Sequence, residues 1–186
     1  MPLSGLIAIQ SVRFPQAFLR MDGSQVTSPQ GGGSGIVNCQ FYLPNTFPDP
    51  SPGNLEVFEI IEIPSVPNNG YGIRSHVYPH AFLRIDGSNV NSFQGGGSGT
   101  VNCQYYAGNG VPVNGDYESL IVGPLLISGD PVYCVATGFQ GVFLRIDGSR
   151  VTSFQGAGSG TVNCQYYSSG DPSSLGDYEV FNIISL

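Results

Sequence analysis

The chain has 186 residues, of which 27 are glycine and 14 are proline, and only 10% are charged. This composition predicts many turns around a real hydrophobic core, and it excludes collagen, wholesale disorder and a membrane-spanning helix. The net charge is -7 and all six basic residues are arginine. Without lysine the chain lacks the basic surface that nucleic acid or an anionic membrane needs, and it also lacks a Schiff-base or P-loop lysine.

An internal repeat organises the sequence. Three segments align without a gap, at residues 18–42, 82–106 and 143–167. The first two segments are identical at 19 of 25 positions, and the last two at 22 of 25. Weaker similarity continues on both sides of each segment. We therefore expect one domain, 1–186, built from repeats at about 1–63, 64–123 and 124–186.

In chain order, each repeat holds four stretches that are typical of β-strands. The first is short and apolar, at 6–13, 72–78 and 131–137. The second runs into an Asp-Gly turn, at 17–24, 81–88 and 142–149. The third and fourth alternate between two faces, the third at 36–42, 100–106 and 161–167, the fourth at 55–61, 116–122 and 177–184. A glycine loop follows the second stretch, at 30–35, 94–99 and 155–160, and a longer polar loop follows the third.

Twelve strands in three equal groups predict an all-β protein whose sheet edges are closed. A pseudo-threefold barrel capped by three hairpins meets this requirement, and a three-coil β-solenoid is the alternative. The motifs AFLRIDGS, TVNCQYY and YEVF resemble those of β-trefoils of the fascin and fibroblast-growth-factor type. The ricin-type trefoils do not match, because the chain has no tryptophan. The resemblance implies a β-trefoil and, as its commonest use, a binding module similar to a lectin.

The alternation of the third strand predicts that Val101, Cys103 and Tyr105 face the core. Cys39 and Cys164 are the equivalents of Cys103, whereas Cys134 has none. We interpret all four as buried thiols, since no spacing favours a metal site or disulfides, and they indicate a reducing compartment.

The opposite face of the third strand carries an asparagine, a glutamine and a tyrosine in every repeat. Amides both donate to and accept from sugar hydroxyls, and a tyrosine ring can cover the apolar face of a sugar. The alternative is that the amides tie down the glycine loop. Arginine and aspartate stand two residues apart on the second strand, so they could form a local ion pair or bind a sugar together.

The glycine loop itself is either a connector or a wall of a ligand site. The candidate ligand-binding residues are therefore those that all three repeats share. They are Arg20, Asp22, Gln30, Gly33, Asn38, Gln40, Tyr42, Arg84, Asp86, Gln94, Gly97, Asn102, Gln104, Tyr106, Arg145, Asp147, Gln155, Gly158, Asn163, Gln165 and Tyr167.

These residues predict a lectin with three equivalent sugar sites, which binds glycans or glycoproteins without catalysis, metal or cofactor. The alternative is a protein-binding role, such as protease inhibition, through the loop 43–54. A cytoskeletal cross-linker comes third, because an acidic chain suits acidic filaments poorly. An enzyme comes last, because His76 and His80 occur in one repeat only. The start of the chain shows no secretory signal, so we expect a cytoplasmic protein or one secreted by another route, and a homodimer stays open.

Overall fold

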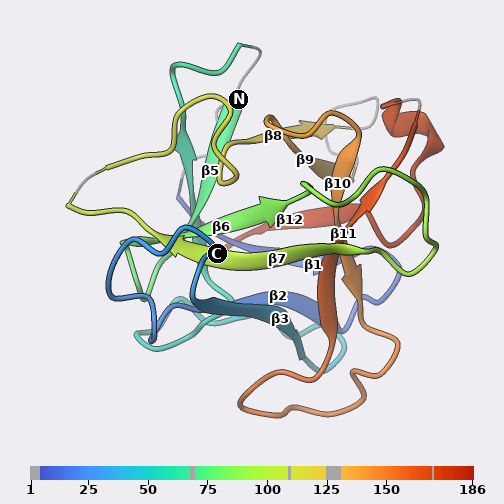
Figure 1. The fold of residues 1–186 in the computed structure, drawn as a ribbon. Coiled ribbons are helices and arrows are strands. Elements are labelled where there is room, and N and C mark those ends of the chain that lie inside the picture. The colour runs from blue at the N-terminus through green and yellow to red at the C-terminus, as the bar shows by residue number, and fades with distance from the viewer. Residues whose placement is uncertain (1–4, 68–69, 109, 125–130, 169) are drawn as a thin grey trace.

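The computed structural model describes residues 5–67, 70–108, 110–124, 131–168 and 170–186. Within these residues the chain forms twelve strands and one short 3-10 helix, η1 (Pro172–Ser174) (Figure 1). The strands are β1 (Leu6–Ser11), β2 (Ala17–Asp22), β3 (Gly35–Phe41), β4 (Phe58–Glu62), β5 (Gly70–Ser75), β6 (Ala81–Asp86), β7 (Gly99–Tyr105), β8 (Leu120–Pro124), β9 (Val132–Ala136), β10 (Val142–Asp147), β11 (Thr161–Tyr166) and β12 (Phe181–Ser185).

The second and third strands of each repeat form the same antiparallel hairpin. In the first repeat β2 pairs with β3 from Ala17 opposite Phe41 to Asp22 opposite Ile36. The pairs β6–β7 and β10–β11 have the equivalent register. The turn after each second strand begins in the same way, because the aspartate side chain accepts a hydrogen bond from the backbone N–H two residues later. The all-β class was therefore predicted correctly, whereas the fourth strand of each repeat begins three or four residues later than predicted.

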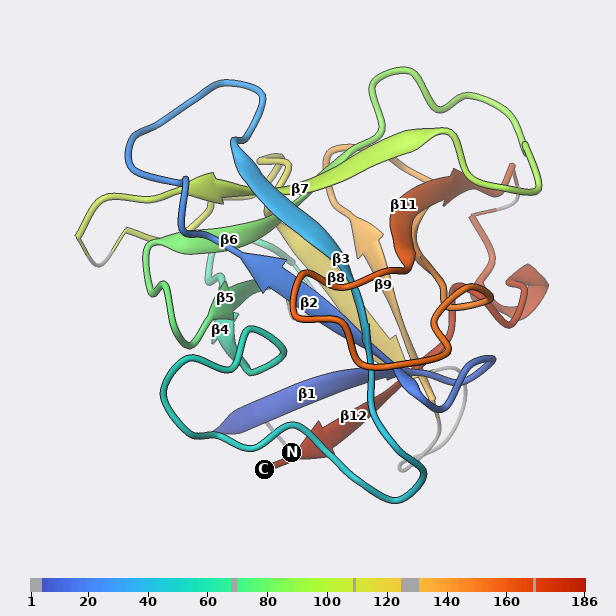
Figure 2. The same ribbon diagram turned by 90° about the horizontal axis from the view of Figure 1, so that it is seen from below.

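The β-trefoil prediction is corrected by the pairing of these strands. The hairpins do not form a separate cap, because β2 pairs with β1 and β10 pairs with β9. Antiparallel pairs follow one another in the order β1, β2, β3, β7, β11, β10, β9, β8, β5 and β4, and β4 pairs back with β1. The strands therefore form a closed ten-stranded barrel, and β6 and β12 are two extra strands. β12 pairs with β1, so the first and last strands of the chain lie side by side (Figure 2).

The four cysteines lie in the core, as the alternation of the third strand predicts. Cys39, Cys103, Cys134 and Cys164 have no exposed surface, and none of them forms a disulfide. Burial raises the pKa of each thiol to about 12. They therefore pack as small apolar groups.

We predict that Gly35→Ala destabilises the fold, whereas Gly31→Ala does not. A Cβ on Gly35 would overlap the Sγ of Cys103 and press on Val26, while a Cβ on Gly31 would meet nothing. Overpacking of this kind costs about 1–3 kcal/mol. Urea denaturation of both variants measures the difference, and equal midpoints would contradict the close contact.

Candidate functional site

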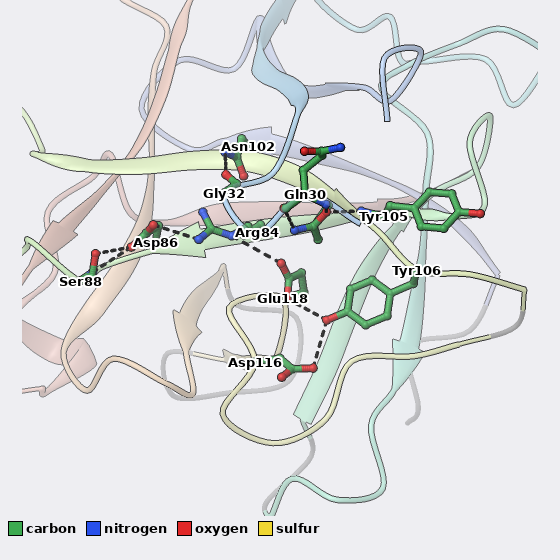
Figure 3. A network of polar contacts seen from close by, with 11 residues as sticks. Gln30, Gly32, Arg84, Asp86, Ser88, Asn102, Tyr105, Tyr106, Asp116 and Glu118 are labelled. Carbon is green, nitrogen blue, oxygen red and sulfur yellow. Dashed lines mark hydrogen bonds and ion pairs between the residues drawn. The ribbon is translucent and has the colours of Figure 1, made fainter. Parts of the chain in front are cut away.

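The glycine loop of the first repeat is held by an amide side chain of the second. The Nε2 of Gln104 donates to the carbonyl oxygen of Gln30, and the Oε1 of Gln104 accepts from the N–H of Gln30 at 3.2 Å (Figure 3). One glutamine side chain thus pairs with both polar groups of one backbone residue. The same Oε1 also accepts from the N–H of Tyr105, so its acceptor capacity is used within the chain.

The asparagine of the same strand binds the tip of this loop. The Nδ2 of Asn102 donates to the carbonyl oxygen of Gly32 at 2.6 Å (Figure 3). The next residue, Gly33, has a φ of 72°. A Cβ at Gly33 would overlap the amide of Asn102, so both the backbone conformation and the close approach require glycine.

The same contacts recur between the other repeats and close a ring. The second loop is held by Asn163 and Gln165 of the third repeat, at 2.8 Å to the oxygen of Gly96 and 3.1 Å from the nitrogen of Gln94. The third loop is held by residues of the first repeat. Asn38 donates to Ala157 at 2.7 Å, and Gln40 pairs with the backbone of Gln155. Each repeat therefore holds the loop of the repeat before it, and the first repeat holds the loop of the third.

The second group of predicted residues forms a buried charged network. In the second repeat, Arg84 bonds to Asp86 at 2.9 Å and lies 3.7 Å from Glu118 (Figure 3). The guanidinium of Arg84 also covers the ring of Tyr117. The hydroxyl of Tyr106 donates to Glu118 at 2.8 Å. The local arginine–aspartate ion pair suggested by the sequence is thus present, and Glu118 extends it.

The other two repeats contain the same network. Arg20 pairs with Asp22 and Glu56, and Arg145 pairs with Asp147 and Glu179. Tyr42 and Tyr167 donate to Glu56 and Glu179 at 3.1 and 2.9 Å. Sequence reasoning missed these glutamates, although the Leu/Tyr–Glu pair that recurs just before the fourth strand of every repeat could have shown them.

The pKa values of the carboxyl groups in these networks are shifted in two directions. Burial raises the pKa of Glu56, Glu118 and Glu179, even though the tyrosine and arginine partners oppose it. At the aspartates burial also acts to raise the pKa, but hydrogen bonds from the serine of the turn and the neighbouring arginine outweigh it. The pKa values of Asp22, Asp86 and Asp147 are therefore lowered.

Some of the predicted residues line two clefts on the surface. Arg84, Gln104 and Tyr106 line a cleft of about 300 Å³ together with Gly31 of the preceding repeat. Arg145 and Asp147 line a separate polar cleft of about 310 Å³. Each site thus lies between two repeats, whereas the sequence suggested a set of residues within one repeat. The asparagine donors and the Nε2 groups of Gln40 and Gln104 are engaged within the chain, whereas the buried Nε2 of Gln165 has no hydrogen-bond partner among the described residues. The binding of a sugar by these residues stays a prediction.

Two exposed phenylalanines were missed by the sequence analysis. Phe154 is 64% exposed and Phe93 is 62% exposed, although both belong to the repeated segment. Phe154 meets the ring of Tyr42 edge-on at 6.2 Å between centroids, and Phe93 meets Tyr167 in the same way at 5.4 Å. The signal was a large apolar residue in a loop made otherwise of Ser, Gln and Gly.

The two histidines have local partners. The Nδ1 of His76 lies 3.3 Å from Glu59, and the ring of His80 packs beside Tyr105. Across the residues that the structure describes, no three His, Cys, Asp or Glu side chains are grouped as metal ligands would be.

We predict that the free energy of unfolding has its maximum at mildly acidic pH. The raised pKa of the three glutamates stabilises the folded state below about pH 4.5, and this contribution is lost as the pH rises through their folded pKa values. The lowered pKa of the three aspartates stabilises the folded state above about pH 3.8, and this contribution is lost in stronger acid. Urea denaturation from pH 3 to 8 (about six steps) measures the profile. Glu118→Gln should reduce the fall in the free energy of unfolding between mildly acidic and neutral pH. An unchanged fall would contradict the raised pKa of Glu118.

Comparison with known proteins yields similarity to solved structures but not to known sequences. No protein-family model matches the chain, and no curated protein matches it. The fold is similar to part of the chain in "Structure and mode of action of a mosquitocidal holotoxin", with a TM-score of 0.62 and 10% sequence identity over 100% of this chain and 18% of that chain. This chain thus corresponds in length to less than one fifth of the toxin chain.

This likeness concerns the fold alone. It corrects the resemblance to the fascin and fibroblast-growth-factor type of trefoil, since the similarity found is to a toxin, and it adds no support for a lectin. None of the described residues belongs to a helix with the length and apolar character needed to cross a membrane. The chain is an all-β barrel with a toxin-like structural neighbour.

Proposed function

We propose that the chain binds carbohydrates, without catalysis, at clefts where the glycine loop of one repeat meets the tyrosine of the next. Glycans or glycoproteins are the proposed partners. The observation that carries this proposal is the recurrence of an exposed phenylalanine edge-on to a tyrosine, as Phe154 to Tyr42 and Phe93 to Tyr167. Exposed aromatic rings in a polar loop are the surface that the apolar C–H face of a sugar requires.

The cleft at Phe154 is the best formed of these sites. It has a volume of about 500 Å³, and Tyr42, Leu43 and Phe154 supply its apolar walls. Thr46, Thr152 and Ser153 add hydroxyl groups beside these walls. A hydroxyl both donates and accepts, so it can pair with a sugar hydroxyl in either orientation. The cleft therefore combines ring contact with several hydrogen-bonding groups.

The cleft of the first loop differs at the position of the phenylalanine. Proline occupies this position as Pro29, and the cleft of about 300 Å³ contains Tyr106 together with Asp116 and Glu118. Tyr106 there packs on Phe82 at 5.2 Å and has no loop phenylalanine beside it. The three sites are thus related in position but unequal in apolar surface, which revises the expectation of three equivalent sites.

We predict that Phe154→Ala and Phe93→Ala each weaken glycan binding by about tenfold at one site, since burying an aromatic side chain contributes about 1.5–3 kcal/mol. Pro29→Phe should strengthen the weak site, because it restores the loop ring beside Tyr106. A glycan array followed by isothermal titration calorimetry measures affinity and stoichiometry. Ile36→Ala is the matched control, because Ile36 is also an exposed large apolar residue, at 55%.

Two results would contradict this proposal. One is the absence of any glycan ligand for the unmodified chain. The other is equal weakening by Ile36→Ala and Phe154→Ala, which would indicate general exposure of apolar surface and no ring contact with a sugar.

The second candidate is a protein-binding role for the loop 43–54. This loop exposes Leu43 and Phe47 and contains four prolines. The backbone and side chain of Thr46 both bond to the carbonyl oxygen of Leu43, and Asn45 between them has a φ of 62°. A loop that is held by its own hydrogen bonds loses little conformational entropy on binding, as an inhibitory loop requires. Its exposed apolar residues can then contact a partner.

For this second candidate we predict that Phe47→Ala abolishes inhibition of any protease that the chain inhibits, while Phe93→Ala leaves it unchanged. Phe93 lies in a different repeat, so it separates loop binding from glycan binding. A panel of serine and cysteine proteases measures residual activity against each variant. Full activity of every protease in the presence of the unmodified chain would exclude the inhibitory role.

A further inference from the structure

The first strand of each repeat pairs with the fourth strand of the repeat before it, and one of these pairings differs from the other two. Gln10 of the first repeat lies opposite Asn182 of the third and shares a hydrogen bond of 3.1 Å with it. Arg74 of the second repeat forms an ion pair with Glu59 of the first. At the equivalent position between the third and second repeats both residues are apolar.

These apolar residues are Val135 and Ile121, which lie directly opposite each other on β9 and β8. Two polar pairs at equivalent positions show that the barrel accepts polar groups there. An apolar pair is therefore not required here by the packing of the fold. This pair changes the surface only where the second and third repeats meet.

In the same region a glycine replaces a larger residue, which leaves more space. Gly141 stands where the first two repeats have Gln16 and His80. Its φ is 78°, and a Cβ would meet the carbonyl oxygen of Tyr167 at 2.6 Å. This position therefore holds no side chain, whereas in the second repeat the ring of His80 packs between Tyr78 and Tyr105.

A cavity of about 550 Å³ lies at this place. Ile121, Val135, Tyr133 and Phe143 contribute to its walls, and the rings of Tyr133 and Phe143 meet edge-on at 5.7 Å. Its polar lining residues include Asn114 and Gln140, which carry amides, besides Tyr133 and Thr137, which carry hydroxyls. None of its described lining residues is charged, in a chain whose net charge is -7.

We propose that this cavity is a binding site for an uncharged, ring-bearing small molecule. Its volume lies within the range of small-molecule sites, roughly 300–1,000 Å³. Apolar and aromatic walls favour a ring, because they bury its surface away from water. Two amides that can donate or accept hydrogen bonds fit a neutral polar group at one end of the ligand. The absence of charged lining residues disfavours an ion, because an ion would lose its hydration without a partner.

This site is independent of the proposed glycan clefts. It shares no lining residue with the clefts at Phe154 and at Pro29. A failure of glycan binding therefore leaves this proposal intact, and the reverse also holds.

The test is titration with Prodan, an uncharged naphthalene dye that carries a carbonyl group and whose emission shifts to the blue in apolar surroundings. We expect a blue shift with saturation by the unmodified chain. Ile121→Glu combined with Val135→Arg introduces the pair found in the second repeat, and it should weaken binding by about tenfold or more by placing charges in the cavity. The matched control is Asn182→Glu combined with Gln10→Arg, which makes the same pair in the first repeat and should leave binding unchanged.

Two outcomes would overturn the proposal. One is no saturable blue shift with the unmodified chain, and the other is equal weakening by the two double variants. Because the charged variant could fail to fold, amide shifts of the unmodified chain in nuclear magnetic resonance give a second measurement. Prodan should shift the amides of Tyr133, Val135 and Gly141, and shifts confined to other parts of the barrel would also overturn it.

Discussion

The hydrogen bonds between each glycine loop and the amide side chains of the next repeat are the constraint on which the structure depends. Gln104 satisfies the backbone of Gln30, Asn102 binds Gly32, and Cys103 packs against Gly35. These three contacts come from consecutive residues of one strand, so the loop is bound on both faces of that strand. Each hydrogen bond of this kind contributes about 0.5–1.5 kcal/mol. The loop and the strand that holds it therefore constrain each other, and this explains why their sequences agree so closely in the three repeats.

The same contacts separate the positions that are shared by the repeats from those that differ. The residues that hold the loops and those of the arginine–glutamate networks recur three times, whereas Pro29, Phe93 and Phe154 differ at the edge of the same loops. Gly141 and the Val135–Ile121 pair differ on the barrel strands. Both proposed binding sites lie where the repeats are free to diverge.

Much of the local structure could be predicted from the sequence, because it depends on spacing along one strand. The alternation of the third strand placed Cys103 in the core, and the spacing of Arg84 and Asp86 indicated their ion pair. The closed ten-stranded barrel could not be predicted in this way, because single pairs such as Gln10 with Phe18 join hairpin to barrel and leave no pattern in the sequence. The hydrogen-bond partner of Gln104 could not be predicted either, since Gln30 is 74 residues away and belongs to another repeat. Phe154 was missed because an isolated apolar residue in a loop has no periodicity.

The contacts between repeats have a direction, since each repeat offers one loop and holds another. Repeat two holds the loop of repeat one, repeat three that of repeat two, and repeat one that of repeat three. This is the head-to-tail arrangement that closes a cyclic trimer of separate subunits. Each repeat carries both complementary surfaces of such an interface. The chain is thus a trimeric ring whose subunits are joined covalently, and a single repeat contains all the contact groups that a ring of three needs.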